Sequence, residues 1–141
     1  MDTKFSVALH ILAMISESTE VLTSQRLATS VGTNASYIRK VIVLLKNAGL
    51  ITSKQGKSGY RMTKAPEELT LLEIYYATQE TDHIQLFQVH QHANKSCPVG
   101  KHITAAVSPI FGEVEEHLEH QLRQQTLTTV ITNLYQKADT N

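Results

Sequence analysis

The sequence predicts a mainly α-helical protein with one small β-hairpin, and three observations support this fold class. Two short amphipathic segments between residues 23 and 48 are joined by a turn that contains a glycine. Two β-prone runs follow directly, on either side of a basic tip with two glycines. After residue 97, apolar residues recur every three or four positions over roughly 25 residues, which is the period of an α-helix. These features predict a winged helix-turn-helix domain followed by a long helix.

The chain of 141 residues is long enough for one domain with an extension, and its apolar fraction of 41% is ordinary for a folded protein. Its formal net charge is zero, but the charges are unevenly distributed. Residues 1–66 contain nine Lys or Arg and three Asp or Glu, about +6, whereas residues 67–141 contain four and ten, about −6. Local positive charge attracts DNA even when the whole chain is neutral. The first half is therefore the candidate nucleic-acid-binding part.

The single cysteine, Cys97, excludes a disulfide within the chain. The first apolar run carries a histidine and lacks a signal-peptide cleavage site. No segment approaches the ~18–20 apolar residues of a membrane span. We therefore expect a cytoplasmic protein that does not enter a membrane.

Residues 4–16 predict an amphipathic first helix with one broad apolar side. In the helix-turn-helix that follows, Thr23 or Ser24 can cap a short helix, and Gly32 can take the left-handed conformation that ends it. Asn34 can then cap a second helix, which runs to Ala48.

The second helix of this pair has two chemically different faces. The apolar stripe, which should pack inward, consists of Ile38, Val41, Ile42 and Leu45. The opposite side is formed by Ser36, Tyr37, Lys40 and Asn47, with Arg39 and Lys46 at its flanks. Such side chains donate hydrogen bonds to base edges and phosphates. A solvated helix face would look similar, but the turn before this helix and the basic hairpin after it favour contact with DNA.

Residues 50–62 predict a β-hairpin with strands at 50–53 and 60–62 and a tip at 54–59. Lys54 and Lys57 at the tip suit contact with phosphate or with the minor groove. A plain exposed hairpin would also be polar and lysine-bearing, so the tip alone proves little.

Thr70 and Glu73 have the spacing of a capping box at the start of a helix over residues 71–77. Tyr75 and Tyr76 within it are expected to cover the core. We assign residues 1–80 to the DNA-binding domain. Residues 81–97 show neither helical nor strand periodicity and are interpreted as a long loop and a possible sensor.

Pro98 suits the first position of a long helix. Its apolar stripe consists of Val99, Ile103, Ala106, Ile110, Val114, Leu118 and Leu122. A small domain cannot cover so long a stripe, so we expect a homodimer through the helix around Val99–Leu122. Pro109, near the middle, should kink or split this helix because it removes a backbone donor.

A short last helix is expected over residues 126–135, before a tail that frays from Lys137. The apolar residues expected to pack back are Leu127, Val130, Ile131 and Leu134. Residues 98–141 together form the predicted dimerisation helices.

The chain resembles the Rrf family of bacterial winged helix-turn-helix regulators, which includes IscR, NsrR and CymR. The matching segments are residues 8–12, Ser36-Tyr37, residues 44–51, the wing at 56–60 and residues 71–74. The resemblance implies a homodimer that binds a partly palindromic operator in double-stranded DNA, usually as a repressor. It assigns groove contacts to Ser36, Tyr37, Arg39 and Lys40, and wing contacts to residues 54–58. The candidate DNA contacts are Ser24, Gln25, Asn34, Ser36, Tyr37, Arg39, Lys40, Lys46, Lys54, Lys57 and Ser58.

The chain departs from the cluster-binding members of that family. Those members hold an iron–sulfur cluster with three cysteines in the loop before the long helix, and only Cys97, which matches the last of the three, is present here. A cluster needs about four ligands. We therefore expect no iron–sulfur cofactor, and place this chain in a branch that lacks the cluster-binding cysteines.

Three kinds of signal stay open for the loop. Cys97 can be a reactive thiol near a helix N-terminus or a buried small hydrophobe. His90, His92 and Cys97, with His83 and His102 nearby in sequence, are candidate metal ligands of a metal-responsive regulator, although their spacing matches no known zinc finger. The third possible signal is a small effector that binds between the loop and the dimer helices.

Two other classes of function compete with DNA-binding regulation. No glycine-rich phosphate loop, nucleophile elbow or framed pair of carboxylates is present, so we expect no enzyme. A protein-interaction module without specific DNA binding would explain the long apolar stripe but not the basic first half.

Overall fold

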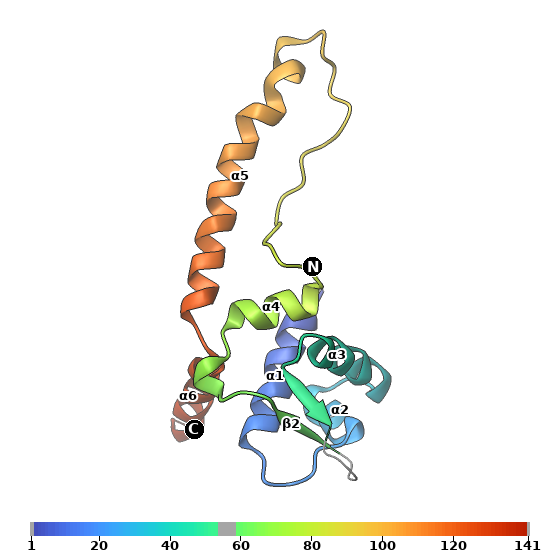
Figure 1. The fold of residues 1–141 in the computed structure, drawn as a ribbon, viewed down its shortest axis with the longest axis vertical. Helices are drawn as coiled ribbons and strands as arrows, with labels where there is room; N and C mark the ends of the chain where they lie inside the picture. The colour runs from blue at the N-terminus through green and yellow to red at the C-terminus, as the bar shows by residue number, and fades with distance from the viewer. Residues whose placement is uncertain (1, 54–58, 141) are drawn as a thin grey trace.

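The computed structural model describes residues 2–53 and 59–140 (Figure 1). In chain order the elements are α1 (Lys4–Glu17), α2 (Ser24–Val31), α3 (Ala35–Asn47), β1 (Ile51–Ser53), β2 (Tyr60–Met62), the 3-10 helix η1 (Pro66–Glu68), α4 (Leu71–Gln79), α5 (Pro98–Gln124) and α6 (Leu127–Asp139). The fold is mainly helical with one antiparallel hairpin, as the sequence predicts. The first four helices and the hairpin form a body from which α5 extends as a long arm.

Helix α1 lies at the centre of the body, with the other elements packed around it. Ala8, Ile11 and Leu12 on α1 are fully buried, and they share one core with Leu27 of α2 and Ile74 of α4. This is the broad apolar side that the sequence predicts for residues 4–16. The core holds the helix-turn-helix on one side of α1 and the base of the arm on another.

The hairpin joins the core through its first strand. Ile51 pairs with Met62 and Ser53 pairs with Tyr60 across the two strands. Ile51 is buried, whereas Thr52 and Ser53 are exposed. The wing is therefore fixed at its base by packing, and the predicted tip residues 54–58 lie outside the described part of the chain.

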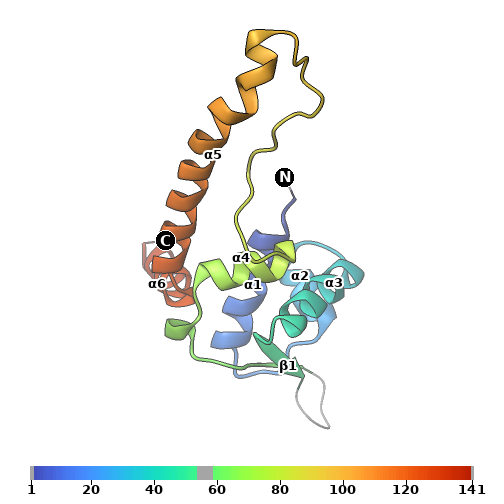
Figure 2. The same cartoon turned by 45° about the horizontal axis from the view of Figure 1, so that its top comes forward.

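The arm consists of α5 and of the loop that leads to it. Figures 1 and 2 both show residues 81–97 running beside α5 toward its far end, with no helix or strand of their own. The carboxylate of Glu115 accepts hydrogen bonds from the backbone N–H groups of Leu86 (2.6 Å) and Phe87 (3.3 Å). The ring of Phe87 lies 4.8 Å from that of Phe111. These contacts hold the loop on the helix, although α5 contains no buried residue.

Pro109 does not split the long helix, contrary to one of the two outcomes expected from the sequence. Helix α5 runs unbroken from Pro98 to Gln124, with Pro109 inside it. A proline in a helix removes one backbone hydrogen bond. More than a full turn of regular helix on each side of Pro109 supplies the remaining bonds, so the helix continues past the gap.

Helix α6 returns to the body at the base of the arm. The N–H of Leu71 donates to the carbonyl of Gln125, and the N–H of Leu127 donates to that of Leu69, both at 2.9 Å. Leu127 is fully buried and Ile131 is 8% exposed, as expected for residues that pack back. This pair of backbone bonds fastens the end of α5 to the start of α4.

Two expectations for the last segment are wrong. Leu134 is 54% exposed and does not pack back, although the hydroxyl of the next residue, Tyr135, donates a hydrogen bond to the Glu17 carboxylate of α1 (2.6 Å). Helix α6 also continues through Lys137 to Asp139 and does not fray there. Gln136, Lys137 and Ala138 are good helix formers, and helix propensity needs no core beneath it to add one more turn to an existing helix.

Among the described residues, no helix combines the length and the apolar character needed to cross a lipid bilayer.

Candidate nucleic-acid interface

The helix-turn-helix is fixed by local capping chemistry. The hydroxyl of Thr23 accepts a hydrogen bond from the N–H of Arg26 (3.2 Å) and caps α2. Gly32 ends α2 with φ of 86°, a left-handed conformation that glycine adopts without strain. The side-chain oxygen of Asn34 accepts from the N–H of Tyr37 (2.8 Å) and caps α3. All three roles were predicted from the sequence.

Helix α3 presents one face to the core and the other to solvent. Its core face consists of Ile38, Val41, Ile42 and Leu45, none of which is more than 2% exposed. Its exposed face consists of Ser36, Arg39, Lys40, Val43, Lys46 and Asn47. The exposed face therefore gathers three cations and two hydrogen-bonding side chains on one surface, as a DNA-reading helix requires.

Tyr37 differs from the other predicted contacts on α3. Its ring is half-buried and packs against the core, and its hydroxyl lies 3.4 Å from the Thr3 hydroxyl oxygen. The sequence places Tyr37 on the polar side, but the start of α1 meets α3 at this flank. Tyr37 thus contributes to the contact between α1 and α3, and only part of its surface is available to DNA.

The opposite flank of α3 faces the wing. The ammonium of Lys46 lies 5.4 Å from the centre of the Tyr60 ring on β2, within the range of a cation–π contact. The Tyr60 hydroxyl lies 3.1 Å from the Ser24 hydroxyl oxygen at the start of α2. Ser24 therefore positions Tyr60, and Tyr60 in turn connects α2, the wing and α3.

The remaining predicted contacts divide by location. Gln25 and Asn34 are exposed near the two helix starts. Lys54, Lys57 and Ser58 lie outside the described residues. The structure adds two residues that sequence reasoning missed: Arg61 is exposed on β2, and Val43 is 51% exposed on α3. Successive side chains of a strand point to opposite faces, so inward positions for Tyr60 and Met62 would have indicated that Arg61 points outward.

The cations on the exposed face of α3 are available for a ligand. Within residues 2–53 and 59–140, Arg39, Lys40 and Lys46 form no ion pair with a carboxylate. Arg26, by contrast, pairs with Glu20, and Lys64 pairs with Glu73 at 2.6 Å. Within the described residues, these two basic side chains of the body are therefore paired, whereas the three cations on α3 are not.

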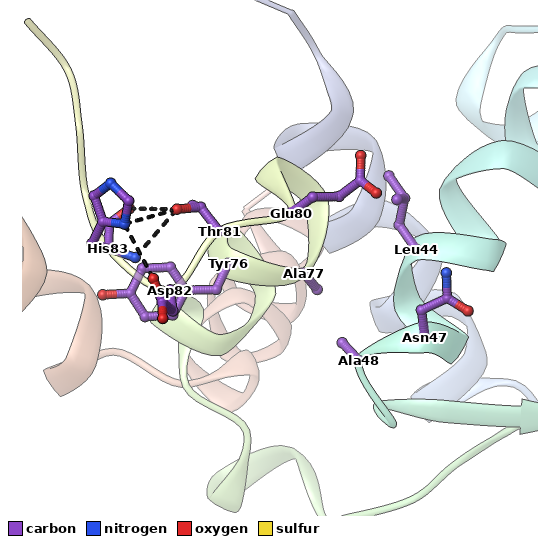
Figure 3. Close-up of a pocket in the computed structure, with 9 residues that line it drawn as sticks. All are labelled: Leu44, Asn47, Ala48, Tyr76, Ala77, Glu80, Thr81, Asp82 and His83. Carbon is purple, nitrogen blue, oxygen red and sulfur yellow. Dashed lines mark hydrogen bonds and ion pairs between the residues drawn. The ribbon is translucent and has the colours of Figure 1, made fainter.

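An open pocket of about 670 Å³ lies beside the C-terminal end of α3 (Figure 3). It is lined by Leu44, Asn47, Ala48, Tyr76, Ala77, Glu80, Thr81, Asp82 and His83. His83 Nδ1 lies 3.1 Å from Asp82 Oδ1, and this hydrogen bond raises the pKa of His83 above its ordinary value. An effector in this pocket would touch α3, α4 and the start of the loop. No residue of α5 lines the pocket, so it differs from the site between the loop and the dimer helices that was expected from the sequence.

Cys97 lies at the far end of the arm as the residue that precedes the first turn of α5. It is exposed, which contradicts the interpretation of a buried small hydrophobe. Hydrogen bonds from the backbone N–H groups of Gly100 and Val99 lower the pKa of the Cys97 thiol. The geometry agrees with the alternative of a reactive thiol at a helix N-terminus.

The candidate metal ligands are not brought together. His90, His92 and Cys97 are exposed at separate points of the loop. Across the described part of the chain, no three His, Cys, Asp or Glu side chains lie close enough to hold one ion. An imidazole-and-thiolate site of the kind weighed from the sequence therefore has no assembled donor set within one chain.

Comparison with known proteins gives consistent results. The sequence model of Rrf2, described as an iron-dependent transcriptional regulator, matches residues 1–133. YwnA of Bacillus subtilis, named as an HTH-type transcriptional regulator, is 38% identical over 135 residues, which cover 96% of this chain and 99% of YwnA. A solved structure described as a DNA-binding protein has a TM-score of 0.74 and 36% identity, over 91% of this chain and 98% of its own. CymR, the global cysteine regulator of B. subtilis, has a TM-score of 0.69 at 18% identity, over 94% and 95% of the two chains, and shares the fold.

The iron named in that description does not fit the donors of this chain. A cluster requires about four ligands, usually thiolates. Cys97 is the only cysteine and is exposed at the end of the arm. Because the described residues place no second and third ligand beside it, we derive no role that depends on iron.

Proposed function

Because the chain belongs to the Rrf2 family and is a DNA-binding transcriptional regulator, not an enzyme, we propose that it represses transcription as a homodimer on a pseudo-palindromic operator. Each protomer inserts the exposed face of α3 into the major groove and places its wing on the adjacent backbone or minor groove. The cytoplasm, where the chromosome is accessible, is the compartment that this role requires.

The observation that carries the proposal is the polar face of α3. It presents Arg39 and Lys40 in the first two turns, unpaired with any described carboxylate, on a helix whose start is fixed by the Asn34 cap. Side chains near the start of a recognition helix are the ones that reach base edges. The orientation of α3 against the core leaves this face clear of the protein interior.

The arm supports the homodimer. On α5, Val99, Ile110 and Val114 are 68%, 60% and 45% exposed, and no residue of the helix is buried. A helix of 27 residues is about 40 Å long. The same helix of a second copy presents an identical stripe, so a two-fold axis through α5 covers both at once and sets the two α3 helices at a fixed separation.

Repression follows from occupancy. A dimer that covers an operator overlapping a promoter blocks polymerase by exclusion and needs no further contact. Activation would require, in addition, a surface that binds polymerase.

Cys97 supports a second element of the proposal, a redox signal. Its exposure and lowered pKa favour the thiolate, which is the reactive form. The Sγ thiolate attacks one oxygen of a hydroperoxide and the O–O bond breaks. The thiol becomes a sulfenic acid, and the peroxide is reduced to hydroxide or alkoxide. This change at the start of α5 would alter the packing of the dimer arm and weaken operator binding.

The function is tested by selecting bound sequences from random DNA duplexes and measuring how many protomers each selected duplex binds. The proposal expects an inverted repeat that binds two protomers. Enrichment of an asymmetric single site with one protomer would contradict the dimer, and no enrichment at all would contradict sequence-specific binding.

The redox element is tested separately with the selected operator. Wild-type protein and Cys97→Ser are treated with mild peroxide, and binding is measured before and after. We expect loss of binding in the wild type alone. An equal loss in both proteins, or none in either, would contradict a role for Cys97.

A further inference from the structure

Val43 is an aliphatic residue at the centre of the exposed polar face of α3. It is 51% exposed, whereas the core stripe of the same helix is almost completely covered. The residues one turn away on either side, all exposed, are Arg39, Lys40, Lys46 and Asn47. Val43 is thus an apolar surface surrounded by hydrogen-bond donors. Its side chain is not part of the core, so it is free to contact a partner outside the chain.

The side chains along the whole of α3 indicate what kind of partner Val43 contacts. The sequence of α3, ASYIRKVIVLLKN, contains no Asp or Glu. In the major groove, guanine offers two acceptors that match Arg or Lys, and thymine offers a 5-methyl group that matches an apolar side chain. Cytosine offers an amino donor that a carboxylate would accept, and α3 has none. The exposed cations of α3 therefore match guanine, Val43 matches the methyl group of thymine, and Asn47 matches adenine.

We propose that Val43 reads the 5-methyl group of a thymine in each operator half-site, one or two base pairs from a guanine contacted by Arg39 or Lys40. Val43 follows these residues by four and three positions, about 6 and 4.5 Å along the helix axis. Successive base pairs are spaced by about 3.4 Å. The inference rests on the proposed function and names which base feature the recognition helix discriminates.

Val43 also borders a groove lined by Asp2, Lys4, Tyr37, Lys40, Val43, Leu44 and Glu80. A protein partner in that groove would be the competing reason for an exposed valine. A thymine contact and a protein contact of Val43 can be distinguished by experiment, because contact with a protein cannot depend on whether the DNA contains thymine or uracil.

The experiment uses the full-length protein and the operator obtained by selection. Each thymine within two base pairs of an enriched guanine is replaced in turn by deoxyuridine, which removes only the methyl group. For wild type we expect binding to weaken about fourfold at one thymine per half-site, the factor that corresponds to one buried methyl group. Val43→Ala shortens the contact, so its affinity should differ less between the thymine and uracil operators than that of wild type.

Leu134→Ala is the matched control, because it shortens a similarly exposed aliphatic side chain on α6. It should keep the wild-type preference for thymine. The inference is overturned if no thymine-to-uracil change weakens wild-type binding, if no thymine is enriched there, or if Val43→Ala keeps the full preference. Each of these results leaves operator binding itself intact, so it is distinguishable from failure of the proposed function, in which no sequence is enriched.

Discussion

Single residues at helix ends decide where the proposed DNA-reading surface lies. Thr23, Gly32 and Asn34 act through their own side chain or backbone conformation within four residues of their position in the sequence. Such chemistry is local, which is why the limits of α2 and α3 could be predicted without a structure. Tyr37 could not be placed in this way, because its partner Thr3 lies 34 residues earlier in the chain.

Two substitutions of Asn34 separate its role as a helix cap from the effect of charge at this position on DNA binding. Asn34→Ala removes the bond to the Tyr37 N–H and should lower the free energy of unfolding by about 1 kcal/mol. Asn34→Asp keeps an equally good cap but adds negative charge beside the proposed DNA. It should leave stability unchanged in urea unfolding at fixed protein concentration, and weaken operator binding. If Asn34→Asp is as unstable as Asn34→Ala, the cap assignment is wrong.

Glu73 should make stability depend on pH. Burial raises its pKa, but the hydrogen bond from Lys64 and that from the Thr70 N–H outweigh burial, and the net pKa lies below the ordinary value. The ionised form therefore favours folding, with a contribution that is present above about pH 4.3 and is lost as the pH falls through the lower folded value.

Glu73→Gln should accordingly be less stable than wild type in urea at pH 7, with a difference that shrinks as the pH falls below about 4. Glu68→Gln, at an exposed carboxylate of η1, is the control and should change stability little. A destabilisation by Glu73→Gln that is constant from pH 7 to pH 3 would show that the Glu73 charge is not involved.

Apolar periodicity in the sequence predicted the helices well, but it did not predict which of their apolar sides are buried. The stripes of α1 and α3 are buried, because each faces a core that the neighbouring elements complete. The same period in α5 leads to no burial within the chain, and Leu134 of α6 is exposed despite its position in the stripe. Periodicity indicates which side is apolar, whereas tertiary geometry decides whether that side is covered.

The loop over residues 81–97 is held on α5 by the Phe87–Phe111 contact and by Glu115. Phe87→Ala should therefore speed amide hydrogen exchange at Leu86 and Phe87 and increase proteolysis of the loop. Gln88→Ala, at the next exposed position, is the control and should behave like wild type. Equal exchange rates in all three proteins would mean that the rings do not hold the loop.

The basic and acidic halves of the chain lie largely in different parts of the molecule. The basic first half forms α1, α2, α3 and the hairpin, and the acidic second half forms α4, the whole arm and α6 (Figure 2). The sequence could not show that α5 continues past Pro109. Whether a helix survives the loss of one backbone hydrogen bond depends on the regular helix on both sides of the proline.

The exposed stripe of α5 predicts how to separate the protomers. Val114→Glu should place a charge in the proposed dimer interface, so the fraction of dimer measured by gel filtration with light scattering should fall. Leu134→Glu introduces the same charge at a similarly exposed leucine on α6 and should leave the dimer intact. A wild-type monomer, or a Val114→Glu protein that remains dimeric, would contradict the arm as the interface.

The most direct test of the account is the salt dependence of operator binding when the exposed cations of α3 are removed. Affinity should be measured across salt concentrations for wild type, for Arg39→Ala with Lys40→Ala, and for Lys101→Ala with Lys137→Ala, which removes two exposed cations from α5 and α6. We predict that the α3 variant loses at least tenfold in affinity, since a base contact by such a side chain is worth about 1–3 kcal/mol. Its dependence on salt should also be shallower than that of the other two proteins. Equal affinity and equal salt dependence in all three would show that α3 does not contact DNA.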